Sequence, residues 1–279
     1  MDTLAFLAPP FVASLILTGI HAYLGLHVVE RGVIFVDLSL AQFAALGSAV
    51  AILIPALDTD PHGPAVYWMS LGFTLIGALV FSTIRGQRAR IPQEAIIGIC
   101  YAVASAATII AMSKATSETE HLKDMLVGNI LAVSWSEVVK TAIVYGGIGA
   151  CHYIFRKRFL AISMDHGRAD SMNGTRWWDF LFYASFGFVV TSSVAIAGVL
   201  LVFCYLIVPS VAAMLYADSI GKRLAIGWSM GTVVSALGVY LSLRLDLPTG
   251  ATIVCTFGLV LIIMATVRPL FVKTVAARV

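Results

Sequence analysis

The hydrophobic and polar positions of this chain fall in long blocks instead of alternating residue by residue. Predominantly apolar blocks recur from end to end and are separated by short polar segments. A helix needs about 20 apolar residues to cross the hydrocarbon core of a bilayer, so blocks of this length indicate membrane-spanning helices. We predict nine spans, over residues 4–29, 33–57, 65–84, 94–113, 136–155, 179–197, 199–216, 224–243 and 251–269.

The number of spans depends on Gly198. The apolar stretch from Asp179 to Tyr216 is too long for one crossing and short for two, so we expect short or broken helices on either side of this glycine. Without a division there, the count falls to eight. The fold class that follows is an all-α, polytopic transmembrane helical bundle of 8–9 spans, and we expect residues 1–279 to form a single domain.

The composition supports a membrane protein. Hydrophobic residues make up 59% of the chain, charged residues make up 12%, and the mean hydropathy is +0.94. A water-soluble domain would expose too much of that apolar surface. The 4 cysteines stand singly in apolar blocks without C-x-x-C spacing, which favours a packing role. The first block lacks a basic leader and an A-x-A-type cleavage site, so we expect a helix there and not a cleaved signal peptide.

The basic residues predict the orientation of the spans. With nine spans, Lys and Arg gather in alternate connections and in the C-terminal segment, while the other connections carry acidic residues. The positive-inside rule places the basic connections in the cytoplasm, so the C-terminus is cytoplasmic and the N-terminus is outside. The cytoplasmic set comprises Arg31, Arg85, Arg88, Arg90, Arg156, Lys157, Arg158, Arg168, Arg176, Lys222, Arg223, Arg268, Lys273 and Arg278.

Signatures of covalent chemistry are absent from the sequence. It contains no G-x-x-x-x-G-K-[ST] phosphate loop and no H-E-x-x-H pair. The segment GWSMG at 227–231 matches G-x-S-x-G, but it lies inside the predicted span 224–243 and not at the strand-to-helix turn that a nucleophile elbow requires. We therefore expect a protein that is not an enzyme and that binds no cofactor of its own. Transport and signalling remain as function classes.

Three segments carry a resemblance to a known family. Residues 25–47 contain an arginine turn followed by a helical stretch with a late glycine, residues 197–213 read AGVLLVFCYLIVPSVAA, and residues 246–251 read DLPTGA. A weaker fourth segment is MLVGNIL at 125–131. In order and spacing these segments resemble the membrane permease subunits of ABC-type importers for zinc, manganese and iron in bacteria. Each segment also has a plain structural reading, since Pro and Gly serve tight turns and helix kinks in any protein.

The resemblance implies partners and a substrate. A permease of this type spans the bacterial inner membrane, and it forms a dimer or pairs with a related permease around a translocation path. A separate cytoplasmic ATPase uses the ATP, and an extracytoplasmic binding protein delivers a divalent metal, with zinc or manganese ahead of iron. The resemblance implies no contact with nucleic acid.

The resemblance also places a short cytoplasmic helix, which docks in the ATPase subunit, after the second segment. An ordinary basic loop is the alternative. The residues assigned to this ATPase coupling are Pro209, Ala213, Asp218, Gly221, Lys222 and Arg223.

The chain departs from the family at the metal ligands. Aligned on Arg31 and Gly47, the family's Asp falls at Leu38 and its His falls at Gln42. Asp37 lies one residue earlier, about 100° round the helix. A carboxamide offers a hard oxygen in place of the imidazole nitrogen that transition metals favour. The usual ligand pair is therefore missing.

Other polar residues are candidates for the substrate path. We expect Asp37 and Gln42 to supply metal-binding oxygens, Ser39 to line the path, and at most one of His21 and His27 to supply nitrogen, because a buried polar residue in a span is a functional candidate. The alternatives are that Asp37 pairs with Arg31 or water and that each histidine is a hydrogen-bonded structural residue.

An acidic cluster in an outer connection is a candidate cation-collecting mouth. It contains Glu118, Glu120, His121 and Asp124, and a solvated acidic loop is the alternative. Two other functions stay open for the whole chain. One is a permease of the same fold for a non-metal or chelated substrate, and the other is a membrane scaffold subunit that transports nothing.

Overall fold

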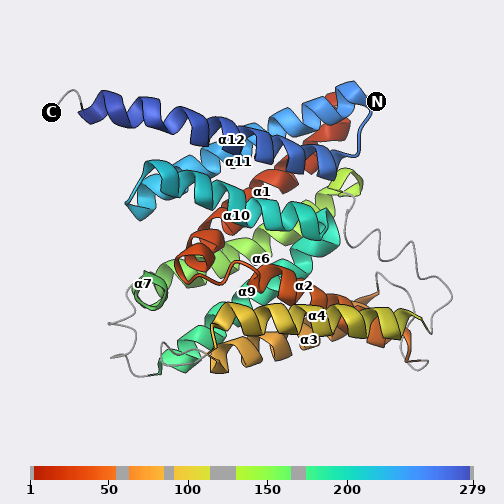
Figure 1. Ribbon diagram of the computed structural model, residues 1–279. Coiled ribbons are helices and arrows are strands. Elements are labelled where there is room, and N and C mark those ends of the chain that lie inside the picture. The colour runs from red at the N-terminus through yellow and green to blue at the C-terminus, as the bar shows by residue number, and fades with distance from the viewer. Residues whose placement is uncertain (1–2, 55–62, 85–90, 114–129, 165–173, 277–279) are drawn as a thin grey trace. The chain divides into compact units, whose positions relative to one another are not determined.

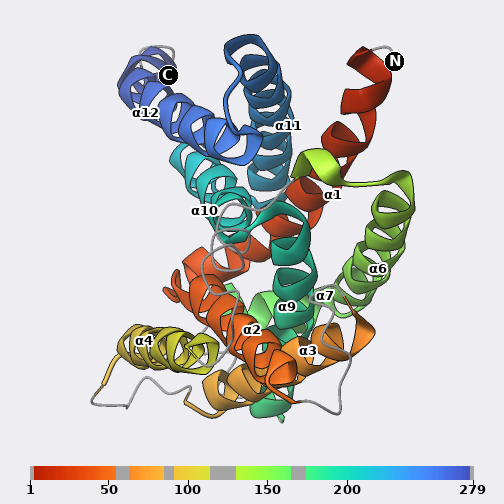
Figure 2. The ribbon, with the colours of Figure 1, turned by 90° about the vertical axis from the view of Figure 1, so that its right-hand side faces the viewer.

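The computed structural model describes residues 3–54, 63–84, 91–113, 130–164 and 174–276, and all regular structure in these ranges is helical. Figures 1 and 2 show the helices from two directions. They are α1 Thr3–Glu30, α2 Val36–Ile52, α3 Pro64–Thr83, α4 Gln93–Met112, the 3-10 helix η1 Ile130–Ala132, α6 Trp135–Ile154, α7 Arg156–Met164, α9 Thr175–Ala197, α10 Val199–Tyr216, α11 Ile220–Leu245 and α12 Thr249–Ala276.

The all-α prediction is confirmed, since a helix lies in each of the nine predicted ranges. In the described residues, seven helices are long and apolar enough to cross a membrane, and an eighth span is added if the bent pair α6 and α7 counts as one. Helix α2 has only 17 residues, fewer than the predicted range 33–57. It begins at Val36, after a turn in which Gly32 has a φ of 66°, and it ends at Ile52, before the predicted end.

Gly198 divides α9 from α10, as predicted. Its φ of 75° and ψ of 160° suit glycine and few other residues, and its N–H donates to the Val194 carbonyl at 2.9 Å. Helix α10 has the 18 residues of the predicted span 199–216, whereas α9, with 23 residues, is longer than expected. The extra length comes from Thr175, where α9 begins four residues before the predicted start.

The described residues form two compact units, divided at 29/30, 144/145 and 199/200. Unit 2 contains α2, α3, α4, α7, α9 and the second part of α6, and α2 packs against α3, α4 and α9 there. Small residues bring these helices close, since a Cβ added at Gly47 would lie 2.7 Å from the Met69 carbonyl oxygen. The Thr74 and Thr191 hydroxyls, 2.9 Å apart, join α3 to α9.

Unit 1 contains most of α1, the first part of α6, and η1, α10, α11 and α12. Helices α11 and α12 pack together, and a Cβ added at Gly238 would lie 2.8 Å from the Ile253 Cα. The DLPTGA segment is the turn between them. Asp246 has a φ of 52°, and the Ser242 hydroxyl reaches the Leu247 carbonyl at 2.7 Å and the Thr249 hydroxyl at 2.6 Å. These hydrogen bonds all lie within the turn and stabilise it.

Helix α7 was absent from the sequence prediction. It is bent by 77° from α6 immediately after Phe155. The Phe159 ring stacks on His152 of α6 with centroids 4.1 Å apart and packs 6.4 Å from the Phe182 ring of α9. These buried aromatic contacts hold a nine-residue helix whose first turn is charged.

Candidate functional site

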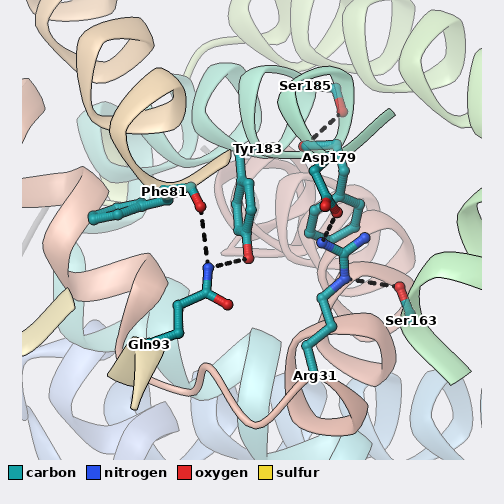
Figure 3. A network of polar contacts seen from close by, with 8 residues as sticks. Arg31, Phe81, Gln93, Ser163, Asp179, Tyr183 and Ser185 are labelled. Carbon is teal, nitrogen blue, oxygen red and sulfur yellow. Dashed lines mark hydrogen bonds and ion pairs between the residues drawn. The ribbon is translucent and has the colours of Figure 1, made fainter. Parts of the chain in front are cut away.

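The turn that leads into α2 is held by an ion pair inside unit 2. Arg31 Nη1 lies 3.0 Å from Asp179 Oδ1 of α9, and the two side chains are 6% and 0% exposed. Arg31 Nε donates to the Ser163 hydroxyl of α7 at 2.8 Å, and the guanidinium lies 3.8 Å from the centroid of Phe182. Figure 3 shows Arg31 reaching between these groups. Arg31 is therefore an internal structural cation and not the surface charge that the orientation argument assumed.

The other end of the same turn is held by α4. The Phe35 N–H donates to Glu94 Oε1 at 3.0 Å, which satisfies a backbone donor at the start of α2. Beside it, Gln93 Nε2 donates to the Phe81 carbonyl at 3.1 Å and to the Tyr183 hydroxyl at 3.2 Å (Figure 3). Side chains of α4, α7 and α9 thus fix where α2 begins.

Two predicted path residues lie buried near the beginning of α2. Asp37 is 1% exposed and Ser39 is 0% exposed. Neither Asp37 Oδ1 nor Ser39 Oγ has a hydrogen-bond partner among the described residues. The alternative in which Asp37 pairs with Arg31 does not hold in the described structure, because the carboxylate beside Arg31 belongs to Asp179.

The remaining polar candidate on α2, Gln42, lies on a different side of the helix. Gln42 and Leu38 are four residues apart, and both are half-buried. Asp37 and Gln42 are five residues apart, so their side chains leave the helix about 140° from each other. One ion cannot be chelated by both from a single copy of α2.

The two candidate histidines belong to the part of α1 in unit 1, and both are buried. His21 Nδ1 lies 2.8 Å from the Leu17 carbonyl oxygen. Because a carbonyl only accepts, this contact places the proton on Nδ1 and leaves Nε2 as the nitrogen suited to a metal. The His27 ring meets the Tyr23 ring edge to face at 4.8 Å. The two imidazoles are six residues apart and leave the helix in different directions.

No group of three or more His, Cys, Asp or Glu side chains that would suit a metal ion occurs in the described part of the chain. The predicted outer mouth, with Glu118, Glu120, His121 and Asp124, lies outside the described residues. The described structure therefore contains single polar groups along α1 and α2, with no preassembled chelate.

The predicted ATPase-coupling segment is a tight turn and not a separate short helix. Helix α10 ends at Tyr216 and α11 begins at Ile220. Arg223 Nε donates to the Ala217 carbonyl at 2.8 Å, which caps the end of α10 and explains the short connection.

The other coupling residues differ in exposure. Asp218, Gly221 and Lys222 are exposed at the turn, whereas Ala213 is buried in α10. Pro209 lies inside α10, which continues past it for seven residues. Proline here is tolerated without ending the helix.

Sequence reasoning missed Asp179, Gln93 and Glu94, which position α2. Asp179 was taken as a span boundary, and its partner Arg31 is 148 residues away, a separation that no local pattern encodes. The adjacent pair Gln93 and Glu94 at the start of an apolar block was the available signal, because acidic residues favour the first turn of a helix.

The chain was compared with known proteins and structures. The model of the ABC 3 transport family matches residues 3–268. The manganese transport system membrane protein MntC of Listeria innocua is 27% identical over 250 residues, covering 86% of each chain. A probable iron transport system membrane protein of Haemophilus influenzae is 29% identical over 171 residues, covering 60% of this chain and 62% of that one.

A solved structure has the same fold. PsaBC from Streptococcus pneumoniae, determined in complex with Fab, superposes with a TM-score of 0.77 at 25% identity, covering 94% of this chain and 93% of that chain. The resemblance that the three sequence segments indicated is confirmed. The chain belongs to the ABC 3 transport family and is a membrane permease subunit of an ABC transporter, in which a separate chain hydrolyses ATP.

Proposed function

We propose that this permease imports a divalent metal cation, with manganese and zinc as the first candidates, along a path to which α2 contributes. The observation that carries the proposal is Asp37, whose buried Oδ1 has no hydrogen-bond partner among the described residues. A buried carboxylate oxygen without a donor is costly unless a proton or a cation occupies the position. The manganese and iron assigned to the relatives by their names support the same substrate class.

The ligands along this path are mostly oxygen atoms. Asp37, Ser39 and Gln42 supply them from α2, and at most one of His21 and His27 supplies a nitrogen. Because Asp37 and Gln42 leave α2 about 140° apart, they serve successive positions of the ion instead of one chelate. Oxygen ligands favour manganese over zinc, which prefers nitrogen and sulfur.

The partners follow from the type of transporter to which the family belongs. A cytoplasmic ATPase docks at the α10–α11 turn, and a binding protein delivers the ion to the outer segment with Glu118, Glu120, His121 and Asp124. A second copy of this chain, or a related permease, completes the path. The chain spans the bacterial inner membrane several times with its C-terminus in the cytoplasm, as the basic connections predict.

A chelated metal is the second candidate substrate. The described residues contain no three-ligand group, and Leu38 and Gln42 replace the ligand pair that the family resemblance calls for. An organic chelate carries its own ligands to the metal, so it needs only a few polar contacts from the path.

Uptake by the reconstituted transporter separates these substrates. Proteoliposomes containing the permease, its ATPase and its binding protein are supplied with manganese, zinc, free iron or chelated iron at limiting concentration. Asp37→Asn is expected to lower manganese uptake about tenfold or more, since even the outer partners of metal ligands contribute 10–100-fold. Asp246→Asn makes the same chemical change in an exposed turn and is the matched control. Uptake of chelated iron alone, unaffected by Asp37→Asn, would contradict the free-cation proposal.

A further inference from the structure

Exposed cations gather where α6 bends into α7. The first turn of α7 consists of Arg156, Lys157 and Arg158, and all three are exposed. The first turn of α9 adds Arg176, which is also exposed. In the described part of the chain, none of these four side chains forms an ion pair. Among the described residues, the cluster therefore gathers positive charge without an acidic partner.

Two of these cations, Arg156 and Arg158, contact aromatic rings. The Arg158 guanidinium lies 5.2 Å from the centroid of Trp178 of α9, and the Phe155 ring lies at the same distance from that indole. Arg156 lies 4.4 Å from the centroid of Tyr153 and donates to the Tyr153 carbonyl at 3.2 Å. These contacts tie the bend to the start of α9 and keep the guanidinium groups beside aromatic faces.

The same place marks a sharp change in surface polarity along a helix pair that has the length and composition of a membrane span. Tyr153 is 68% exposed and Ile154 is 70% exposed, and the next turn is cationic. Trp177 on α9 is 59% exposed. Exposed apolar side chains, then Trp and Tyr, then Lys and Arg, are the order found where a protein passes from the hydrocarbon core to the headgroups.

We propose that this cluster, which we name the bend cluster and define as Tyr153, Arg156, Lys157, Arg158, Arg176 and Trp177, binds the headgroups of anionic phospholipids. The cations face the phosphates, and the aromatic rings lie at the level of the glycerol backbone. An acidic face of a soluble partner would match the charges, but it would leave Tyr153 and Ile154 of the spanning helix without an apolar neighbour. A lipid supplies both the anionic headgroup and the apolar chain.

Fluorescence quenching tests this proposal on the full chain. The permease is placed in nanodiscs of brominated phosphatidylglycerol diluted in unlabelled phosphatidylcholine, and in a second set brominated phosphatidylcholine replaces it. Trp177→Phe identifies the signal from the indole of the bend cluster, and Trp178→Phe identifies the signal from the neighbouring indole beside Arg158. We expect the brominated anionic lipid to quench these indoles preferentially, with a preference that falls in high salt.

Charge variants give the decisive comparison. The triple variant Arg156→Gln, Lys157→Gln, Arg158→Gln is expected to lose the anionic preference by roughly tenfold or more, because each basic side chain near the surface contributes to lipid affinity. The control triple Lys140→Gln, Arg244→Gln, Arg268→Gln removes the same charge from other exposed positions, and Arg244 also stacks on a tyrosine, Tyr240. This control should keep the preference.

A third variant controls for misfolding of the triple variant Arg156→Gln, Lys157→Gln, Arg158→Gln, which we call the bend triple. Arg156→Lys with Arg158→Lys keeps the charge, and the proposal requires it to retain most of the lipid preference. Equal quenching by both lipids in the unaltered chain, or equal losses in both Gln triples, would overturn the proposal. Loss of ATPase-subunit binding in the bend triple, with its lipid preference intact, would also overturn it and assign the bend cluster to a protein partner.

Discussion

The start of α2 lies within one segment that resembles the family and the α10–α11 turn follows another, yet the two regions are built differently. Before α2, the ion pair of Arg31 and Asp179 is almost wholly buried, and Glu94 and Ser163 add contacts from two more helices. At the α10–α11 turn, Asp218 and Lys222 are exposed. The first region is constructed to hold one helix in place, whereas the second presents side chains that its own fold does not use.

This difference predicts where substitutions affect stability and where they affect coupling. Contacts around the start of α2 exist to position a helix with buried polar atoms, so their loss is costly within the permease itself. Apart from the bond of Arg223 to the Ala217 carbonyl, we expect the exposed side chains of the α10–α11 turn to matter only when a partner is present. The experiments below are ordered by the expected size of their effect on the stability of the isolated permease.

Breaking the buried ion pair has the largest expected effect. Arg31→Met leaves Asp179 buried without its cation, and we expect a loss of about 3–5 kcal/mol in the free energy of unfolding. Thermal unfolding in detergent, followed by size-exclusion chromatography, measures it. The double variant Arg31→Met, Asp179→Leu should recover part of the loss, because an apolar pair removes the unpaired charge. Unfolding of Arg31→Met at the unaltered temperature would show that the pair contributes nothing.

Removing the cap from α4 has an intermediate effect. Glu94→Ala leaves the Phe35 N–H without its acceptor, and we expect a loss of about 1 kcal/mol because the site is partly exposed. The same thermal assay applies, and Glu94→Gln, which keeps an acceptor oxygen, is the control. The cap would have no role in positioning α2 if the Ala and Gln variants unfolded together at the unaltered temperature.

Charge reversal at the exposed turn has the smallest effect on the permease alone. Lys222→Glu should change its stability by no more than about 0.5 kcal/mol, as for other surface positions. In the assembled transporter it should lower stimulation of the ATPase, because a rim charge governs association with an acidic partner. Arg223→Glu is a less specific test of coupling, since it also removes the hydrogen bond from Arg223 to the Ala217 carbonyl. Full stimulation by the Lys222→Glu permease would remove this turn from the coupling mechanism.

Proline usually disrupts a helix, but Gly221→Pro is not expected to disrupt α11. Gly221 is the second residue of α11, where a backbone N–H has no partner within the helix. Proline is tolerated at the beginning of a helix for that reason. We therefore expect Gly221→Pro to insert and fold normally, and retention of its helix content by circular dichroism checks this. Gly221→Pro therefore changes the backbone at the beginning of α11 and leaves the rest of the helix intact.

The spans were predictable because hydrophobic length is a local property of the sequence. Gly198 was recognisable as a boundary for the same reason, and its positive φ confirms the division. Helix α7 escaped prediction, since it begins with Arg156 and is kept in place by distant aromatic rings such as Phe182. The pairing of Arg31 with Asp179 also depends on tertiary packing, so the sequence alone suggested the nearer Asp37 as its partner.

The candidate site was predictable only in part. The family resemblance identified α2 and located the missing ligands at Leu38 and Gln42, and the structure shows these two residues on one half-buried side of that helix. The burial of Asp37 and the contacts that fix α2 depend on α3, α4 and α9, which no local pattern encodes. Which residues meet the ion therefore remains a prediction.

The most direct test of the account is the competition between zinc and manganese in a permease with the family ligands restored. In the double variant Leu38→Asp, Gln42→His, a carboxylate and an imidazole lie four residues apart on the same side of α2. Reconstituted uptake is measured with both ions present, and the unaltered chain and the single variants serve as controls. If α2 lines a cation path, the double variant should shift the uptake ratio toward zinc by about tenfold or more, because it adds a nitrogen ligand. An unchanged ratio, in a variant that folds and transports, would contradict the claim that the ion passes α2.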